Sequence, residues 1–342
     1  MRLTRSAAAA AAAAGLVLAC AASASAEPID LGEAPGFVVG NTVWDLYPEP
    51  PVTVRNVWVY EEGTDPTAPG AEEHLLNAGS NDMWWAAFIG DDGSEYYAPG
   101  LEFDAATQAN GDIVVTGPVE ELEGLQVTMQ FRFYAAGDLV RVLVTYTNPT
   151  TAPITVRTGT ESTFLDGDSP AITATSTGDT TVSTADRWLV GHDGGEGAPV
   201  LTMVWQGPDA PLPADEVDEV GTEGFDLETA QDVTFAPGAT VHFAYFTAVT
   251  GYGSSEEPPG PTPTPSPTST AGAQATVVAD DLAAAAASAA SAASEFNSFS
   301  GRLIAGLPAG ANVLNWGVVP TATPGTPAAP ATPVVTAPAF TG

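Results

Sequence analysis

The feature that most constrains the fold is an alternation of apolar and polar side chains along residues 125–147. A period of two is typical of strands that place one face in a core and the other in water. The segment Ala135–Asp138 interrupts the alternation with a glycine-containing turn. Asn148 and Pro149 end the second strand, because proline cannot donate to a ladder. A third strand is expected from Ile154, so the pattern predicts an antiparallel meander.

Further short apolar or alternating segments, separated by Gly, Pro, Asn and Asp, run through residues 28–256. The other expected strands are 37–46, 52–60, 82–89, 113–116, 171–176, 180–183, 187–190, 200–206, 233–235 and 240–248. About a dozen short strands with turn signals predict an all-β domain, a β-sandwich of two packed antiparallel sheets. A closed barrel is the alternative, but Val- and Thr-rich strands with one polar face favour the sandwich.

Residues 1–26 have the pattern of a secretory leader: two arginines, an apolar stretch too short to span a membrane, and a cleavage site. The site is the A-x-A sequence Ala24–Ala26, which predicts a mature chain that begins at Glu27. The alternative is the stretch Val17–Cys20, which resembles a bacterial lipobox and would make Cys20 the lipidated N-terminus. Both interpretations predict an extracytoplasmic protein, either secreted or held at the cell surface.

Low-complexity segments follow the predicted sandwich. Residues 257–275 are rich in Pro and Thr and predict an extended polyproline II linker. Residues 276–318 predict a short helical segment, which begins with an Ala/Ser-rich stretch and ends with large apolar side chains that could pack back on the sandwich. Residues 319–342 are rich in Pro, Thr and Ala, a composition typical of disorder. No transmembrane span is expected in the mature chain.

The scarcity of basic residues narrows the classes of function. The 342 residues include 42 Asp and Glu but only 8 Lys and Arg, all arginine, for a formal net charge of -34. Without lysine, a Schiff base and a P-loop are both excluded. The few arginines are spread along the chain, so nucleic-acid binding is not expected. Cleavage after Ala26 removes Cys20, the only cysteine, and with it any disulfide or thiol nucleophile. Two explanations of this excess of acidic over basic residues remain open: adaptation to a high-salt habitat, and a GC-rich genome that avoids lysine codons.

Aromatic pairs and one histidine are the candidate ligand-binding residues. Trp84 is followed by Trp85, and Tyr96 by Tyr97. Neighbouring side chains of a strand point to opposite faces, so one ring of each pair could lie where a sugar stacks. His192 lies among glycines and acidic residues that could form a site. Packing in the core for the aromatic residues, and an ordinary polar turn for His192, are the simpler interpretations.

Asp166 and Asp168 are candidate calcium ligands, because Asp-x-Asp spacing can supply carboxylate oxygens. The rest of an EF-hand loop is missing, and Asp91–Gly93 is a similar weak pattern. No other cofactor is predicted. His74 and His242 have no metal-ligand spacing, and are expected to be a solvated loop residue and a strand-face residue. The nucleophile elbow Gly-x-Ser-x-Gly and the dinucleotide motif Gly-x-Gly-x-x-Gly are both missing from the sequence.

One stretch of the predicted meander resembles a known family. The run Leu139–Thr158 contains Val-Thr-Tyr-Thr-Asn-Pro-Thr-Thr-Ala-Pro-Ile-Thr-Val and resembles a strand–turn–strand common in bacterial extracellular β-sandwiches. It is similar to the corresponding hairpin of the galactose-mutarotase-like sandwiches, which bind or act on sugars. The turn Ala236–Thr240, Ala-Pro-Gly-Ala-Thr, also resembles turns of these sandwiches. The resemblance implies a sandwich fold and a glycan partner. That family has a histidine shortly after the hairpin, whereas Arg157–Phe164 contains none, so the resemblance assigns no catalytic residue here.

These observations lead to two functional hypotheses. The first is an exported, non-catalytic β-sandwich protein of the cell surface or extracellular space. The alternative is a carbohydrate-binding or carbohydrate-active protein with a mutarotase-like sandwich. Exposed Trp or Tyr beside carboxylates on a concave sheet face would favour the alternative, and a face filled with Val and Thr would favour the first. Whether the protein is an enzyme, and its oligomeric state, are left open by the sequence.

Overall fold

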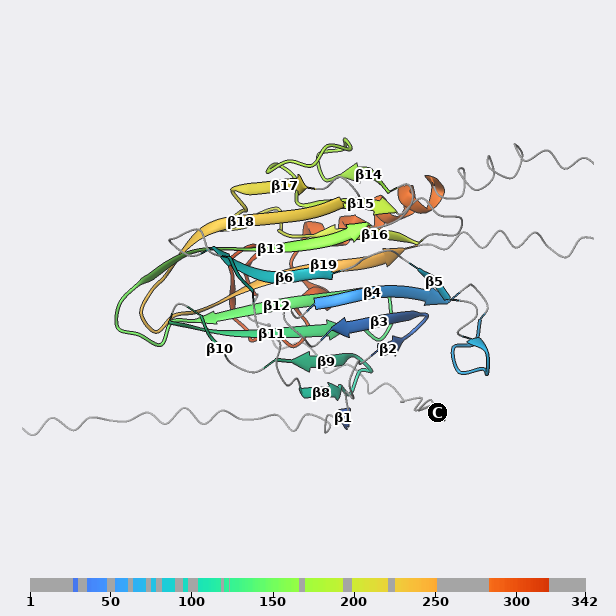
Figure 1. Cartoon of the computed structure of the whole chain (residues 1–342), viewed down its shortest axis with the longest axis horizontal. Helices are drawn as coiled ribbons and strands as arrows, with labels where there is room; N and C mark the ends of the chain where they lie inside the picture. The colour runs from blue at the N-terminus through green and yellow to red at the C-terminus, as the bar shows by residue number, and fades with distance from the viewer. Residues whose placement is uncertain are drawn as a thin grey trace, which may run out of the picture.

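The computed structural model describes only part of the chain. The described residues are 27–29, 36–47, 53–60, 64–71, 75–77, 82–89, 95–97, 104–117, 120–122, 124–165, 170–192, 199–220, 225–250 and 283–319. Within them the protein is a two-sheet antiparallel β-sandwich with a short helical segment near its C-terminal end (Figure 1).

The larger sheet has twelve strands within the described residues. Its order is β1 (Glu27–Ile29), β8 (Asp104–Thr107), β9 (Ile113–Thr116), β11 (Leu125–Phe133), β12 (Leu139–Thr147), β19 (Thr240–Thr250), β16 (Val200–Val204), β15 (Trp188–His192) and β14 (Ala171–Thr175). The short strands β10 (Glu120–Leu122), β20 (Asn312–Val313) and β21 (Gly317–Val318) join it at β11 and β19. The single bridge between β19 and β20 is parallel, and the other pairings in this sheet are antiparallel.

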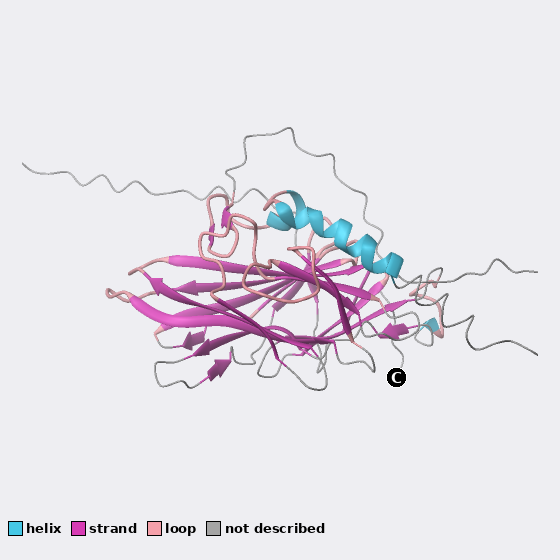
Figure 2. Ribbon diagram, turned by 90° about the horizontal axis from the view of Figure 1, so that it is seen from above, coloured by secondary structure: helices cyan, strands magenta, loops and turns pink. Residues whose placement is uncertain are grey.

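The smaller sheet packs against one face of the larger sheet (Figure 2). Its order is β17 (Glu216–Val220), β18 (Phe225–Phe235), β13 (Ile154–Leu165), β6 (Asp82–Ile89), β4 (Thr53–Tyr60), β3 (Thr42–Tyr47) and β2 (Gly36–Val39), with β5 (Leu75–Asn77) on β4 and β7 (Glu95–Tyr97) on β6.

Apolar side chains from both sheets fill the space between them. The alternating residues of β11 and β12 point into this core as the sequence pattern predicts. Aromatic contacts join the two layers: the ring centroids of Trp44 and Phe133 are 5.9 Å apart, and those of Tyr146 and Phe235 are 5.4 Å apart. Burial of large apolar side chains is the main favourable term in folding, so this interface is the principal source of stability.

The predicted meander is right for its first two strands and wrong for the third. β11 and β12 pair along their length, but β13 pairs with β6 and β18 in the opposite sheet. The chain changes sheets at a corner that the side chain of Asn148 stabilises: its Nδ2 donates to the carbonyl oxygens of Ala152 and Phe235, at 2.8 and 2.9 Å. The edge of β12 that a third meander strand would occupy is taken by β19.

Two other expected strands are also corrected. The predicted strand 37–46 is the hairpin of β2 and β3, turned at Gly40, whose φ is +59°. A Cβ atom at Gly40 would lie 2.5 Å from the carbonyl oxygen of Ala136, so the close approach of the two turns requires glycine. Residues 180–183 form a bent loop instead of a strand, because Asp186 accepts hydrogen bonds from the backbone amides of Thr177 and Ser183.

The outer face of the larger sheet is covered by residues 283–319, which we call the C-terminal cap (Figure 2). The cap consists of a helix at 283–292, the 3₁₀ turns η2 (Ala293–Asn297) and η3 (Gly301–Ile304), and the strands β20 and β21. Its buried side chains pack on β12, β15, β16 and β19. They include Ala286, Ala289, Phe296, Leu303, Val313 and Trp316.

Candidate functional site

The most unusual chemistry of the described residues lies between the C-terminal cap and the larger sheet. Arg132 of β11 and Arg141 of β12 are direct partners across the hairpin, and both side chains point to the covered face. Arg132 is 7% exposed and Arg141 is fully buried. Like charges directly opposite each other in a sheet are destabilising, so this pair needs compensation from its surroundings.

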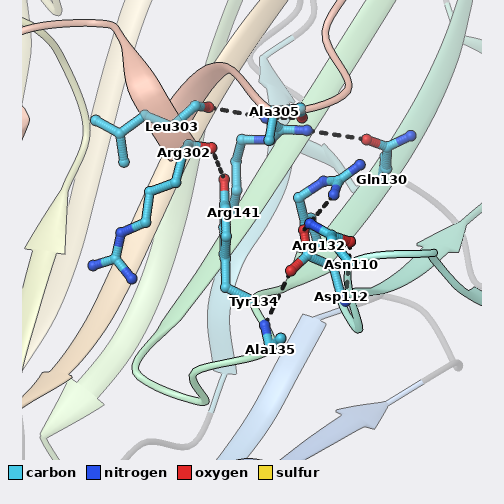
Figure 3. Close-up of polar contacts among 10 residues, drawn as sticks. All are labelled: Asn110, Asp112, Gln130, Arg132, Tyr134, Ala135, Arg141, Arg302, Leu303 and Ala305. Atoms are coloured by element: carbon cyan, nitrogen blue, oxygen red, sulfur yellow. Dashed lines mark hydrogen bonds and ion pairs between the residues drawn. The ribbon is translucent and has the colours of Figure 1, made fainter. Parts of the chain in front are cut away.

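Asp112 compensates the first of these charges. Its carboxylate accepts a hydrogen bond from Nη1 of Arg132 in a buried ion pair. The other carboxylate oxygen accepts from the backbone amide of Ala135, at 3.0 Å, and Asn110 donates to Asp112 at 2.9 Å. The ion pair therefore joins the loop before β9 to the β11–β12 turn (Figure 3).

The positive charge of Arg141 is stabilised by uncharged oxygen acceptors and not by a carboxylate. Its Nη1 donates to the carbonyl oxygens of Leu303 and Ala305, both at 2.9 Å, and its Nη2 lies 3.3 Å from Oε1 of Gln130 (Figure 3). Burial, the largest influence, lowers the pKa of Arg141 to about 10, so the guanidinium stays charged at neutral pH. The cap thus supplies acceptors for a buried cation of the sheet.

Two more arginines tie the cap to the sandwich at its rim. Arg302 forms a bidentate pair with Glu295, in which Nε and Nη2 each donate to one carboxylate oxygen, and its Nη1 lies 2.9 Å from both oxygens of Asp138. Arg187 donates to the side-chain oxygen of Asn297. Exposed ion pairs contribute little, but several together fix the position of a segment.

A row of half-buried polar side chains continues along the same face next to the cap. Thr128 of β11 is the cross-strand partner of Thr145, which in turn is the partner of His242. The Oγ1 atom of Thr145 lies 2.9 Å from Nδ1 of His242. Burial and, less strongly, the charge of Arg141 lower the pKa of His242, so its imidazole is neutral at pH 7. The row, completed by Gln130, presents neutral donors and acceptors.

Trp84, one of the residues singled out in the sequence, lies in the core and is fully buried. Its φ of +60° is unusual for a bulky residue and coincides with an irregularity in the β6–β13 pairing. Its amide donates to Oγ of Ser162 at 2.7 Å, and its indole donates to Oγ1 of Thr247 at 2.8 Å. The ring stacks on Tyr245 with centroids 5.1 Å apart. This indole joins the sheets and offers no surface for a sugar.

The remaining candidates are placed only in part. Trp85 lies in β6, and Tyr96 and Tyr97 lie in β7, but their side chains are outside the described residues. His192 ends β15 and is half-buried; its Nδ1 has no hydrogen-bond partner, and burial lowers its pKa.

The other sequence-based candidates lie outside the described residues. These are Cys20, His74, Asp91, Asp92, Asp166 and Asp168. Calcium binding by Asp166 and Asp168, and lipidation of Cys20, stay predictions.

In the described ranges, three or more His, Cys, Asp or Glu side chains nowhere gather in a way that could hold a metal ion. The helices in those ranges are too short or too polar to cross a membrane.

Sequence reasoning missed the buried arginines. Alternation placed Arg132 and Arg141 on the water-facing side of the hairpin, and that face is covered only because a distant segment packs on it. The expected packing of the apolar residues of segment 276–318 on the sandwich is found, but the sequence did not indicate that this segment covers the face with the two arginines.

No family model and no curated protein sequence matches the chain. Several solved structures are similar to it. They include a galactose mutarotase-like protein from Lactobacillus casei (10% identity, 63% of this chain and 99% of that chain, TM-score 0.39), a TPR-domain containing protein from Parabacteroides distasonis (8%, 63% and 46%, 0.41) and the GH36 α-galactosidase AgaB from Geobacillus stearothermophilus (8%, 66% and 41%, 0.36).

The expected similarity to galactose mutarotase-like sandwiches is therefore found among solved structures. The identities are at most 10% and the TM-scores at most 0.41 for these three, so no conclusion about activity follows from them.

Proposed function

We propose that the chain is an exported, non-catalytic β-sandwich protein of the cell surface or extracellular space. The observation that carries the proposal is the use of the scarce arginines. Arg141 and Arg187 bond residues of the C-terminal cap, Arg302 of the cap bonds Asp138 of the sandwich, and Arg132 is paired with Asp112 directly beneath the cap. These cations hold the fold together, and the leader-like residues 1–26 support export.

Fractionation of the native protein tests export. The intact mass is measured separately in medium, membrane and cytoplasmic fractions. A secreted species that starts at Glu27, or a membrane-bound species that starts at acylated Cys20, supports the proposal. A cytoplasmic species that retains Met1–Ala26 contradicts it.

A carbohydrate-binding role is the second candidate, favoured by the neutral polar row beside the cap. Thr128, Gln130, Thr145 and His242 are half-buried neighbours on three adjacent strands. Hydroxyl, amide and neutral imidazole groups match the hydrogen-bonding needs of sugar hydroxyls. The same side chains are also compatible with an ordinary polar sheet face that binds only water.

A glycan array distinguishes these interpretations of the row. Specific binding by the mature chain that is lost in Thr145→Val and His242→Ala supports the carbohydrate role. The matched control is Thr234→Val, which removes an exposed threonine from the outer face of the smaller sheet. Absence of binding, or equal binding by all variants, rejects this row as a glycan site.

A further inference from the structure

The turn between β8 and β9 contains the only Asn-Gly pair of the sequence, Asn110 and Gly111. Both residues are exposed to water. Because glycine has no side chain, its backbone nitrogen can approach the side chain of a preceding asparagine with little steric hindrance. An exposed Asn-Gly pair is therefore the sequence in which the side-chain amide is most open to attack by the next backbone nitrogen.

One contact of the turn places the side chain of Asn110 beside the backbone that would attack it. Its Oδ1 lies 3.3 Å from the backbone nitrogen of Asp112, as in an Asx turn, and Gly111 between them has a φ of +87°. The N–H of Gly111 donates to the carbonyl oxygen of Gln108 at 2.9 Å. The attack therefore proceeds from a local opening of this exposed turn, which requires far less free energy than global unfolding.

Asn110 also supports the buried ion pair of Asp112 and Arg132. Its Nδ2 donates to Oδ2 of Asp112 at 2.9 Å (Figure 3). The same carboxylate accepts from Nη1 of Arg132 and from the backbone amide of Ala135. Asp112 is only 3% exposed, so these donors, and not water, stabilise its charge. A chemical change at Asn110 therefore acts directly on the ion pair.

We propose that Asn110 is a site of spontaneous deamidation, which weakens the ion pair of Asp112 and Arg132. The backbone nitrogen of Gly111 bonds to Cγ of Asn110 and the bond from Cγ to Nδ2 breaks. The amino group leaves as ammonia with the proton that the backbone nitrogen gives up, and a succinimide ring is left. One water molecule then opens the ring at either of its two carbonyl carbons. Opening at Cγ gives aspartate, and opening at the backbone carbonyl carbon gives isoaspartate.

Both products replace the N–H donor of Asn110 by a carboxylate oxygen. In the aspartate product this oxygen faces Oδ2 of Asp112, and the two negative charges repel each other. In the isoaspartate product the main chain is longer by a methylene group, which also disturbs the turn that positions Asp112. The stability of the larger sheet thus declines as the molecule ages. The proposal depends neither on export nor on carbohydrate binding.

Incubation of the purified protein at neutral pH in water labelled with heavy oxygen tests the site without any variant. Peptide mapping by mass spectrometry follows Asn110 and, as the internal control, Asn297, which is also exposed but precedes a serine. Asn110 should convert faster, to aspartate and isoaspartate that each carry the label. If Asn110 stays intact or reacts no faster than Asn297, the proposal is wrong. Aspartate without isoaspartate would mean direct hydrolysis and would overturn the succinimide route.

Charge variants test the effect on the ion pair independently of the reaction. Asn110→Asp reproduces one product, and its unfolding equilibrium constant in urea should be about five- to thirtyfold larger than that of the unmodified protein. Asn297→Asp adds the same charge to the cap beside Arg187 and should change the constant by about twofold or less. Equal stability of Asn110→Asp and the unmodified protein contradicts the effect on the ion pair.

A double-mutant cycle assigns the effect to the carboxylate of Asp112. In the background of Asp112→Asn the like charge is gone, so Asn110→Asp should destabilise the protein much less. An equal loss in both backgrounds would show that the repulsion is not the cause. If Asp112→Asn fails to fold, the comparison of Asn110→Asp with Asn110→Ser decides, because serine removes the same hydrogen bond without adding a charge. Equal losses in these two variants count against the repulsion.

Discussion

Asn315 of the C-terminal cap pairs with Ala244 of β19 as a residue of a neighbouring strand would. Its side-chain oxygen accepts from the amide of Ala244 at 3.0 Å, and its side-chain nitrogen donates to the carbonyl oxygen of Ala244 at 2.8 Å. β16 pairs with β19 only as far as Phe246, so Ala244 lies beyond the end of this pairing. The side-chain amide of Asn315 therefore bonds the backbone N–H and C=O of Ala244 in place of a strand. The cap is thus continuous with the sheet.

Replacing Asn315 should be costly for this reason. In Asn315→Ala the buried amide of Ala244 and the carbonyl oxygen of Trp205 lose a partner. We expect a loss of about 2–4 kcal/mol in the free energy of unfolding, from an orphaned donor and acceptor. Urea denaturation measures it. Asn297→Ala, at an exposed residue of the same cap, is the control and should cost well under half of that.

Gly306 and Gly310 form a matched pair for the contact between cap and arginines. Both have a left-handed backbone, with φ of +73° and +77°, but only Gly306 faces a neighbour, Nη2 of Arg132. Alanine at either position is destabilising because its side chain disfavours a positive φ. Gly306→Ala should lower the free energy of unfolding by about 1–3 kcal/mol more than Gly310→Ala, because its methyl group would also overlap Arg132. Thermal or urea unfolding of the two variants gives the difference. Equal losses would show that Arg132 does not support the cap.

Trp84 is expected to join the two sheets through its indole N–H as well as through packing. Trp84→Phe keeps a ring but leaves Thr247 without its donor, and should cost about 1–3 kcal/mol. In a double-mutant cycle with Thr247→Val, the two losses should be clearly less than additive. Additive losses would mean that the hydrogen bond is not made in solution.

His242 makes the stability depend on pH near neutrality. Because its pKa is lowered in the fold, the unfolded chain, titrating near about 6.5, binds more protons. The stability contributed by this group is therefore complete above about pH 6.5 and declines as the pH falls below it. His242→Gln should show a shallower decline between pH 7 and pH 5 in urea titrations. If the stability of His242→Gln and of the unmodified protein depends on pH with the same slope, the imidazole of His242 is exposed to water and its pKa is not lowered by folding.

Much of the sandwich could be predicted from local patterns. Alternation in β11 and β12, the turn at Gly137 and the break at Pro149 are properties of short stretches, and the structure has them where the sequence indicates. The sheet to which β13 belongs could not be read this way, because its alternation would be the same in either sheet. The corner at Asn148 decides it through contacts distant in sequence.

The candidate site was harder to predict than the fold. Arg132 and Arg141 occupy polar positions of an amphipathic hairpin, which in sequence terms face water. Their burial depends on residues 283–319, which follow β19 only after a long Pro-rich stretch. The core position of Trp84 agrees with the simpler interpretation of the aromatic pairs, but its left-handed backbone has no sequence signature.

The most direct test of the account is whether the C-terminal cap stays on the sandwich without its covalent connection. A specific protease site is inserted within residues 257–275, and the purified protein is cleaved and examined by native mass spectrometry and gel filtration. We predict that both fragments remain together as one complex, held by the arginine contacts and the apolar face of the cap. Separation of the C-terminal fragment under native conditions would contradict the account.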